Sequence, residues 1–224
     1  KEKYVKRAEH ETEALKLCRH ACGRTSFDRE YLLSVNPSCA YYTVNETLRP
    51  EFYGENWEPD HCIKHRIFVT QGNYPIKGIH FMLEAMGILV KEYPDISLRV
   101  AGDKITANRS LKDKIKISSY GKYLLDLVKA NGLEDHVEFT GSLTAGDMRE
   151  EYKQAEVYVI PSMIENSPNS LGEAMLMGMP CVSANVGGVS GIFTDGEDGI
   201  LYEADTDTKT ASVVKDNNHD FDVT

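Results

Sequence analysis

The sequence has no long apolar run and no long basic run. Although 41% of its 224 residues are hydrophobic, no stretch approaches the ~20 apolar residues that a membrane span needs. The first residues also lack the apolar region of a signal peptide. A net charge of −10 disfavours nucleic acid and anionic membrane surfaces as main partners. These absences predict a cytoplasmic chain, without a transmembrane segment, that binds a small ligand.

Cysteines are few and odd in number. The chain has five, at Cys18, Cys22, Cys39, Cys62 and Cys181. They are scattered, and Cys181 opens an apolar segment, so free thiols are expected rather than disulfides. Two short spacings of Cys and His, around His20 and between His61 and His65, each lack the second half that a zinc site requires. We therefore predict no metal site.

The clearest pattern lies in residues 158–182. An apolar run, Tyr158 to Ile160, stops at Pro161, and a polar loop follows. Apolar residues then recur at helical spacing from Leu171 until Gly178 and Pro180, which are typical of a helix end. The pattern predicts a strand, a loop and a helix.

The start of this helix is a candidate anion site. Ser167 is a good N-cap and Pro168 a good first helical residue, which would leave the backbone N–H groups of Asn169 and Ser170 unpaired. Unpaired N–H groups at a helix start attract negatively charged groups. Two carboxylates, Glu165 and Glu173, flank this start with seven residues between them.

From residue 66 onward, predicted strands and helices alternate. The strands are expected at 67–70, 96–101, 137–140, 157–160, 181–184 and 200–202, and the helices at 77–92, 120–130, 145–154 and after the loop described above. Alternation of this kind predicts an α/β fold with a doubly wound, Rossmann-like parallel sheet. Ligands on such sheets bind beyond the carboxyl ends of the strands. The loops at 71–77, 102–103, 141–142, 161–169 and 185–188 should therefore converge on one crevice.

The two ends of the chain are less regular. We expect an amphipathic surface helix at 3–17, a short helix from Thr25 or Ser26 to Leu33, a strand-like segment at 40–44 and a linker at 45–62. After Tyr202 the sequence is polar and predicts a loose tail with at most a short helix. The chain thus divides into an amino-terminal part at 1–62, a sheet domain at 63–204 and a tail at 205–224.

The motif resembles that of a known family. Residues 165–174 read ENSPNSLGEA, and with Gly178-Met179-Pro180 they resemble the donor-sugar motif of glycosyltransferase family 4, retaining enzymes of the GT-B fold. The resemblance implies transfer of a sugar from a UDP- or GDP-linked donor, as substrate, to an acceptor hydroxyl with retention of configuration. It implies no cofactor and no metal. Glycan or glycolipid acceptors, in surface polysaccharide or glycolipid synthesis, are expected.

The resemblance also implies roles for the charged residues. Lys77, followed by Gly78, resembles the lysine that family members place against the diphosphate. Many members have an arginine five residues earlier, where this chain has Gly72. Diphosphate binding would then rest on Lys77 and the amides of Asn169, Ser170 and Leu171. Glu173 would bind the ribose hydroxyls. Glu165 would bind a sugar hydroxyl and stabilise positive charge at the anomeric carbon, which makes it the catalytic candidate.

Two glycine loops complete the resemblance. Gly141-Ser142 resembles the loop that receives the nucleotide base through its backbone, although a turn at a strand end explains it equally well. Gly187-Gly188 resembles the glycine pair near the sugar and phosphate. The glutamate that often follows this pair is absent.

Residues 1–62 resemble the end of the amino-terminal domain of family 4 enzymes and the connection to the second domain. We therefore expect the donor-binding half of an enzyme, inactive alone and completed by a partner amino-terminal domain. Attachment of a longer protein to the inner face of the membrane stays open. Two alternatives remain: a non-catalytic nucleotide-sugar-binding module that acts with a partner chain, and a nucleotide-sugar epimerase of GT-B type. A dinucleotide dehydrogenase is disfavoured because the first strand lacks G-x-G-x-x-G.

Overall fold

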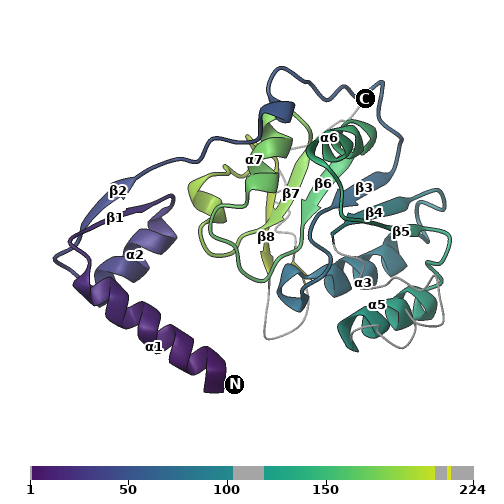
Figure 1. Cartoon of the computed structure of the whole chain (residues 1–224). Helices are drawn as coiled ribbons and strands as arrows, with labels where there is room; N and C mark the ends of the chain where they lie inside the picture. Colours follow the sequence, from purple (N-terminus) through teal and green to yellow (C-terminus); the bar gives the residue numbers. More distant parts are fainter. Residues whose placement is uncertain (1, 103–118, 205–210, 213–224) are drawn as a thin grey trace.

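The computed structural model describes residues 2–102, 119–204 and 211–212, and it contains one large sheet with helices on both faces (Figure 1). The strands of this sheet are β3 (Arg66–Val69), β4 (Ser97–Ala101), β5 (Val137–Gly141), β6 (Val157–Ile160), β7 (Cys181–Ala184), β8 (Ile200–Ala204) and β9 (Ala211–Ser212). Their order is β5-β4-β3-β6-β7-β8-β9. All neighbours pair in parallel except β8 and β9. The predicted doubly wound α/β sheet is confirmed.

The helices of the sheet domain follow the strands in sequence. They are α3 (Ile79–Leu89), α5 (Ser119–Ala130), α6 (Ala145–Gln154) and α7 (Asn169–Leu176), with short 3-10 turns η2 (Pro75–Lys77) and η3 (Val189–Gly191). The strand order reverses between β3 and β6, because the chain first builds outward to β5 and then returns to start the other half. In sheets of this topology the ligand crevice lies at that reversal.

Alternating side chains of the strands feed two cores, one on each face of the sheet. Phe68 of β3 packs with Tyr152 of α6 and Leu171 of α7, whereas Ile67 and Val69 pack under α3 and α5. Figure 1 shows the two helix pairs on opposite sides of the sheet. Period-two alternation in the strands thus produces both helical layers.

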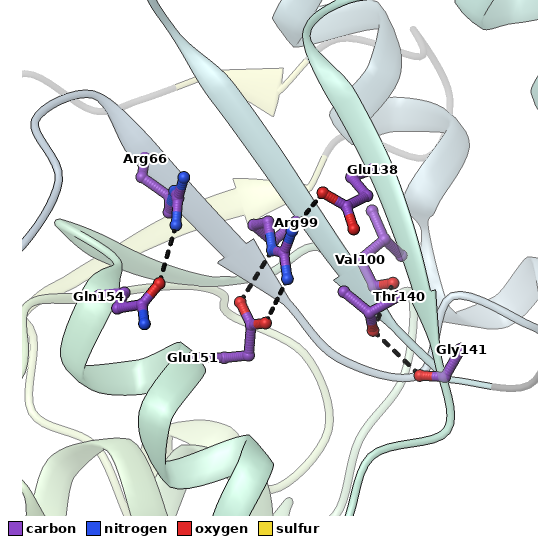
Figure 2. Close-up of polar contacts among 8 residues, drawn as sticks. All are labelled: Arg66, Arg99, Val100, Glu138, Thr140, Gly141, Glu151 and Gln154. Atoms are coloured by element: carbon purple, nitrogen blue, oxygen red, sulfur yellow. Dashed lines mark hydrogen bonds and ion pairs between the residues drawn. The ribbon is translucent and has the colours of Figure 1, made fainter.

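An ion pair and a hydrogen bond fix α6 to strands β4 and β3 of the sheet (Figure 2). The Arg99 guanidinium donates from Nε and Nη2 to the two carboxylate oxygens of Glu151, at 2.9 and 2.5 Å, and also binds Glu138 on β5. Arg66 donates to the Gln154 side chain at 3.1 Å. The hydrogen bonds from Arg99 to Glu151 are the largest cause of a raised Arg99 pKa, and the nearby Glu138 raises this pKa further.

The amino-terminal segment, residues 2–62, contains α1 (Glu2–Leu17), β1 (His20–Gly23), α2 (Ser26–Val35), β2 (Ala40–Thr43) and the 3-10 turn η1 (Pro50–Phe52). Both predicted helices are confirmed, and Thr25 caps α2 by accepting from the Asp28 amide. No sequence pattern predicted β1, which pairs in parallel with β2. Its four residues, His-Ala-Cys-Gly, include no β-branched side chain, so only the pairing makes them a strand.

The predicted linker packs on the sheet domain. Phe52 is fully buried against Tyr152, and Trp57 donates its indole N–H to the Ala155 carbonyl at 2.7 Å. The Ile63 amide likewise donates to the Gln154 carbonyl. The linker is irregular in backbone but is anchored by these contacts.

Three predictions about boundaries need correction. α3 begins at Ile79 rather than Lys77, because Gly78 before it is left-handed (φ 72°). A Cβ on Gly78 would lie 1.7 Å from the Pro161 carbonyl oxygen, an approach that only glycine tolerates. α3 also ends at Leu89, three residues before the predicted end. In the tail, Ala211–Ser212 form β9 beside β8 rather than a loose end or a helix. The rest of 205–224 lies outside the described residues, as does Asp103.

Candidate functional site

Two adjoining cavities lie at the carboxyl ends of β3 and β6, where the strand order reverses. The first, of about 210 Å³, includes Lys77, Glu165 and the start of α7. The second, of about 530 Å³, includes Arg49, Ser142 and Glu173. Among the residues that the structure describes, four line both: Thr70, Gln71, Asn169 and Ser170. Together the cavities form one elongated site whose middle is the first turn of α7.

Lys77 and Glu165 form an ion pair in the first cavity. The Lys77 ammonium lies 2.5 Å from Glu165 Oε1, which also accepts from the Ser162 hydroxyl at 2.8 Å. The two side chains are 20% and 12% exposed, so the pair is largely shielded from water. An ammonium has three N–H donors, so Lys77 can bind an anion while it still contacts Glu165.

Glu173, a more deeply buried carboxylate than Glu165, forms a second ion pair in the other cavity. Its side chain is 2% exposed, and both oxygens accept from the Arg49 guanidinium, at 2.7 and 2.8 Å. The hydrogen bonds from Arg49 to this carboxylate raise the pKa of the arginine. Arg49 also lies over the ring of Phe52, 4.9 Å from its centroid. A carboxylate has about four lone-pair positions, so two remain for hydroxyl donors of a ligand.

The start of α7 differs by one residue from the prediction. Pro168, not Ser167, is the N-cap, and no side chain caps the helix. Pro168 has an extended ψ of 116°, so the chain turns helical only at Asn169. The amides of Asn169 and Ser170 remain at the helix start, where no intrahelical acceptor exists. The Leu171 amide donates to the Pro168 carbonyl and the Leu171 side chain is fully buried, so Leu171 contributes to the core instead.

The predicted glycines shape the walls rather than line the cavities. A Cβ on Gly72 would lie 2.5 Å from Val100, and the Gly72 amide donates to the Ala101 carbonyl at 3.0 Å. Gly141 takes φ 82° at the end of β5 and its carbonyl accepts from the Gly102 amide, while the next residue, Ser142, lines the second cavity.

Gly187 and Gly188 support the loop that carries Glu165. A Cβ on Gly187, which has φ 57°, would lie 2.0 Å from the Glu165 carbonyl oxygen. The Gly188 amide donates to that same oxygen at 2.9 Å, and a Cβ there would lie 2.4 Å from the Asn166 carbonyl oxygen. The absence of side chains at both glycines allows the two loops to touch, which fixes the backbone at Glu165.

The structure also brings in residues that sequence reasoning missed. Arg24 lines the first cavity and Arg49 the second, although both belong to the amino-terminal segment. No local pattern marks either arginine. Gln71 lines both cavities with a left-handed backbone (φ 60°), which is uncommon for a residue other than glycine. The sequence placed Gln71 in the 71–77 loop expected at the crevice but assigned it no role there.

Within the part of the chain that the structure describes, no group of three or more His, Cys, Asp or Glu side chains could hold a metal ion. All five cysteines are free thiols. Burial raises the pKa of Cys181 to about 12, and this residue is buried in the core that also contains Phe68 and Tyr152. None of the described helices is long and apolar enough to cross a bilayer.

Comparison with known proteins identifies the family. Residues 64–216 match the family model of the glycosyl transferases group 1. The D-inositol 3-phosphate glycosyltransferase of Paenarthrobacter aurescens is 30% identical over 141 residues, which is 63% of this chain and 32% of that protein. The spore coat protein SA of Bacillus subtilis is 26% identical over 143 residues, 63% of this chain and 36% of that protein.

Solved structures share the fold. Sucrose-phosphate synthase from Thermosynechococcus elongatus superimposes with a TM-score of 0.69 at 22% identity, covering 86% of this chain and 47% of that one. HepE of Anabaena, solved with UDP and glucose, gives 0.66 at 19% identity, covering 83% and 49%.

The chain belongs to the glycosyl transferases group 1, a family 4-like group of GT-B glycosyltransferases, as the sequence motif predicted. It spans about a third of the length of these curated relatives and about half of these solved structures.

Proposed function

We propose that this chain is the donor-binding half of a retaining glycosyltransferase, which transfers a sugar from a nucleotide-diphosphate donor to an acceptor hydroxyl. One observation carries the proposal: two cavities, one lined by Glu165 and the other by Glu173, share the first turn of α7. A nucleotide sugar has the same order, with a diphosphate between nucleoside and sugar. The diphosphate would lie at the shared helix start, the sugar toward Glu165 and the ribose toward Glu173.

The chemistry follows from where charge develops. As the bond between the anomeric carbon and the diphosphate breaks, the diphosphate gains negative charge, and donors fixed in advance stabilise that charge best. Lys77 and the amides of Asn169 and Ser170 are such donors, and none of them depends on a metal ion. Glu165 would bind a sugar hydroxyl and favour positive charge at the anomeric carbon.

In the second cavity, Glu173 would accept hydrogen bonds from the ribose hydroxyls through the lone pairs that Arg49 does not use. Ser142 and Leu143 line the same cavity. We assign this wall to the nucleotide base, as the resemblance implies for the loop at Gly141 and Ser142. The site therefore offers a carboxylate, oriented by Arg49, as the acceptor for a diol next to a partly apolar surface.

The ligands bound in structures of similar fold support a nucleotide-sugar donor. HepE was solved with UDP and glucose and with UDP-glucose, and a pneumococcal O-GlcNAc transferase with UDP and GlcNAc. A nucleotide-diphosphate donor is accordingly our choice for this chain. Glycan or glycolipid acceptors, a role in surface polysaccharide or glycolipid synthesis, a completing amino-terminal domain and a cytoplasmic location stay predictions.

A calorimetric panel tests the proposal. UDP, GDP, ADP and their sugars are titrated into the chain in a chelating buffer, and thermal shift gives a second readout, because a ligand that binds only the folded state raises the midpoint. We expect one diphosphate to bind without added metal, and Lys77→Ala to weaken it. The absence of binding by every nucleotide, or binding only with magnesium, would contradict the proposal. Release of free sugar without an acceptor would favour the epimerase alternative.

A further inference from the structure

Arg24 reaches the donor site from outside the sheet domain. It lies in the turn between β1 and α2, and its guanidinium donates to the Ser167 carbonyl at 3.1 Å and to the Asn169 side-chain oxygen at 2.6 Å. It also pairs with Glu46 at 2.9 Å. Arg24 therefore lines the first cavity at the start of α7. The proposed mechanism gives it no role so far.

The charge around Arg24 is incompletely balanced. A cation beside a helix start is unfavourable, because the first-turn amides carry partial positive charge. Lys77 adds a second cation to the same cavity, and the one carboxylate among the described lining residues, Glu165, already pairs with it. Glu46 is 52% exposed, so water screens its attraction for Arg24. An anion bound in this cavity would relieve the repulsion among these groups.

The turn that carries Arg24 is tied to the Glu165 loop. Asp28 accepts from the Arg24 amide at 2.9 Å and from the Asn166 side chain at 2.8 Å, and Thr25 also bonds to Asn166. Although burial alone would raise the pKa of Asp28, these hydrogen bonds and one from Tyr41 hold it below its ordinary value. The ionised Asp28 thus fixes the backbone of Arg24 relative to Glu165.

We propose that Arg24 binds a phosphate of the nucleotide-diphosphate donor, as the second cation of the site beside Lys77. This inference rests on the proposed function. Of the five N–H donors of a guanidinium, three contact Ser167, Asn169 and Glu46, which leaves two for phosphate oxygens. Gly72 offers no cation to the site, and Arg24 supplies the missing charge from the amino-terminal segment.

The test compares a charged and an uncharged ligand. UDP is titrated calorimetrically into wild type and Arg24→Ala, and weak uridine binding is followed by ligand-observed NMR; GDP and guanosine are run in parallel. We expect Arg24→Ala to weaken the diphosphate by roughly 10- to 100-fold, the range for a lost hydrogen bond to a charged group. The nucleoside should bind as before, and Arg24→Lys should recover part of the loss.

Matched variants separate charge from structure. Arg29→Ala removes an exposed arginine of α2 and should bind UDP as wild type does. Glu46→Gln removes the competing carboxylate and should leave UDP binding equal or tighter. If Arg24→Ala does not fold, judged by circular dichroism, Arg24→Gln keeps neutral donors and replaces it in the same titrations.

The outcomes are distinct. Unchanged UDP affinity in Arg24→Ala, or equal losses for UDP and uridine, would overturn the assignment while the proposed function stands on Lys77. Weakening by Glu46→Gln as large as that by Arg24→Ala would show that the pair acts only in folding, and would also overturn it. If no diphosphate binds wild type, the proposed function fails and the Arg24 assignment fails with it.

Discussion

The sheet domain and the amino-terminal segment contribute to the site in different ways. Most buried hydrophobic side chains lie in the sheet domain, whereas among the described residues of the segment only Leu32, Cys39 and Phe52 are buried hydrophobics, and α1 buries none. Yet the segment places two arginines, Arg24 and Arg49, in the cavities. A region with little core of its own thus supplies charge to a site that another region holds rigid.

The first prediction tests how the amino-terminal segment is attached, by truncating Phe52, its fully buried contact with the sheet domain. Phe52→Ala should lower the free energy of unfolding by about 3–5 kcal/mol, because a fully buried ring leaves a cavity behind. Urea denaturation measures the loss. The adjacent Tyr53, 50% exposed, gives the matched control, and Tyr53→Ala should cost little. Equal effects of the two variants would mean that the segment is not anchored there.

The second prediction concerns Arg49. Arg49→Ala should cost about 3 kcal/mol of unfolding free energy, at the lower end of the range for a broken buried pair, because Glu173 would stay buried without its partner while Arg49 itself is 44% exposed. Chemical denaturation checks this. Combining Arg49→Met with Glu173→Gln removes both charges and should recover much of the loss. A single Arg49→Ala variant as stable as wild type would contradict the role assigned to the pair.

The third prediction separates the two glutamates within the sheet domain. Glu173→Gln should weaken UDP and its sugar-linked form alike, by about 1–3 kcal/mol, since both carry the ribose. Glu165→Gln should leave UDP unchanged and weaken only the sugar-bearing donor. Calorimetry with both ligands is the readout. Glutamine is preferred to alanine because Glu173 is paired in the core, so truncation would also affect stability. Loss of bare UDP binding in a folded Glu165→Gln variant would reverse the roles.

The fourth prediction uses pH to test the contact that Asp28 makes between the two regions. The folded-state pKa of Asp28 is lowered, so its contribution to stability is present above the ordinary aspartate pKa and is lost as the pH falls through the folded value. The difference in melting temperature between wild type and Asp28→Asn should therefore be full at about pH 7 and shrink toward zero below about pH 4. A difference that stayed constant over this range would show that ionisation of Asp28 plays no part.

The smallest effect is expected in α1. Tyr4 is 78% exposed in a helix with no buried residue, so Tyr4→Ser should change the free energy of unfolding by no more than about 0.5 kcal/mol. Thermal and urea unfolding provide the measurement. A loss above 1 kcal/mol, by the same principle, would show that α1 is packed in solution and that the contrast between the two regions is weaker than described.

Local patterns in the sequence were sufficient for the sheet domain. The bounds of α6, β6 and β7 agree with the expected ranges to the residue, because period-two and helical spacing and proline and glycine stops are all short-range signals. The errors arose where a distant contact decides the backbone. Gly78 lies so close to the Pro161 carbonyl that no side chain fits there, and β1 is a strand because β2 pairs with it.

The candidate site divides in the same way. The sequence by itself determined the family and the parallel sheet, and it predicted that Lys77, Glu165 and Glu173 lie near one another, because loops after parallel strands meet at one edge of the sheet. It placed the start of α7 one residue too early. Only the tertiary structure decided which charges face one another. Arg49 and Glu173 are 124 residues apart in the chain, and Arg24 and Asn169 are 145 apart. The attraction between charges depends on their distance and shielding in the folded chain, and no local pattern of residues encodes either.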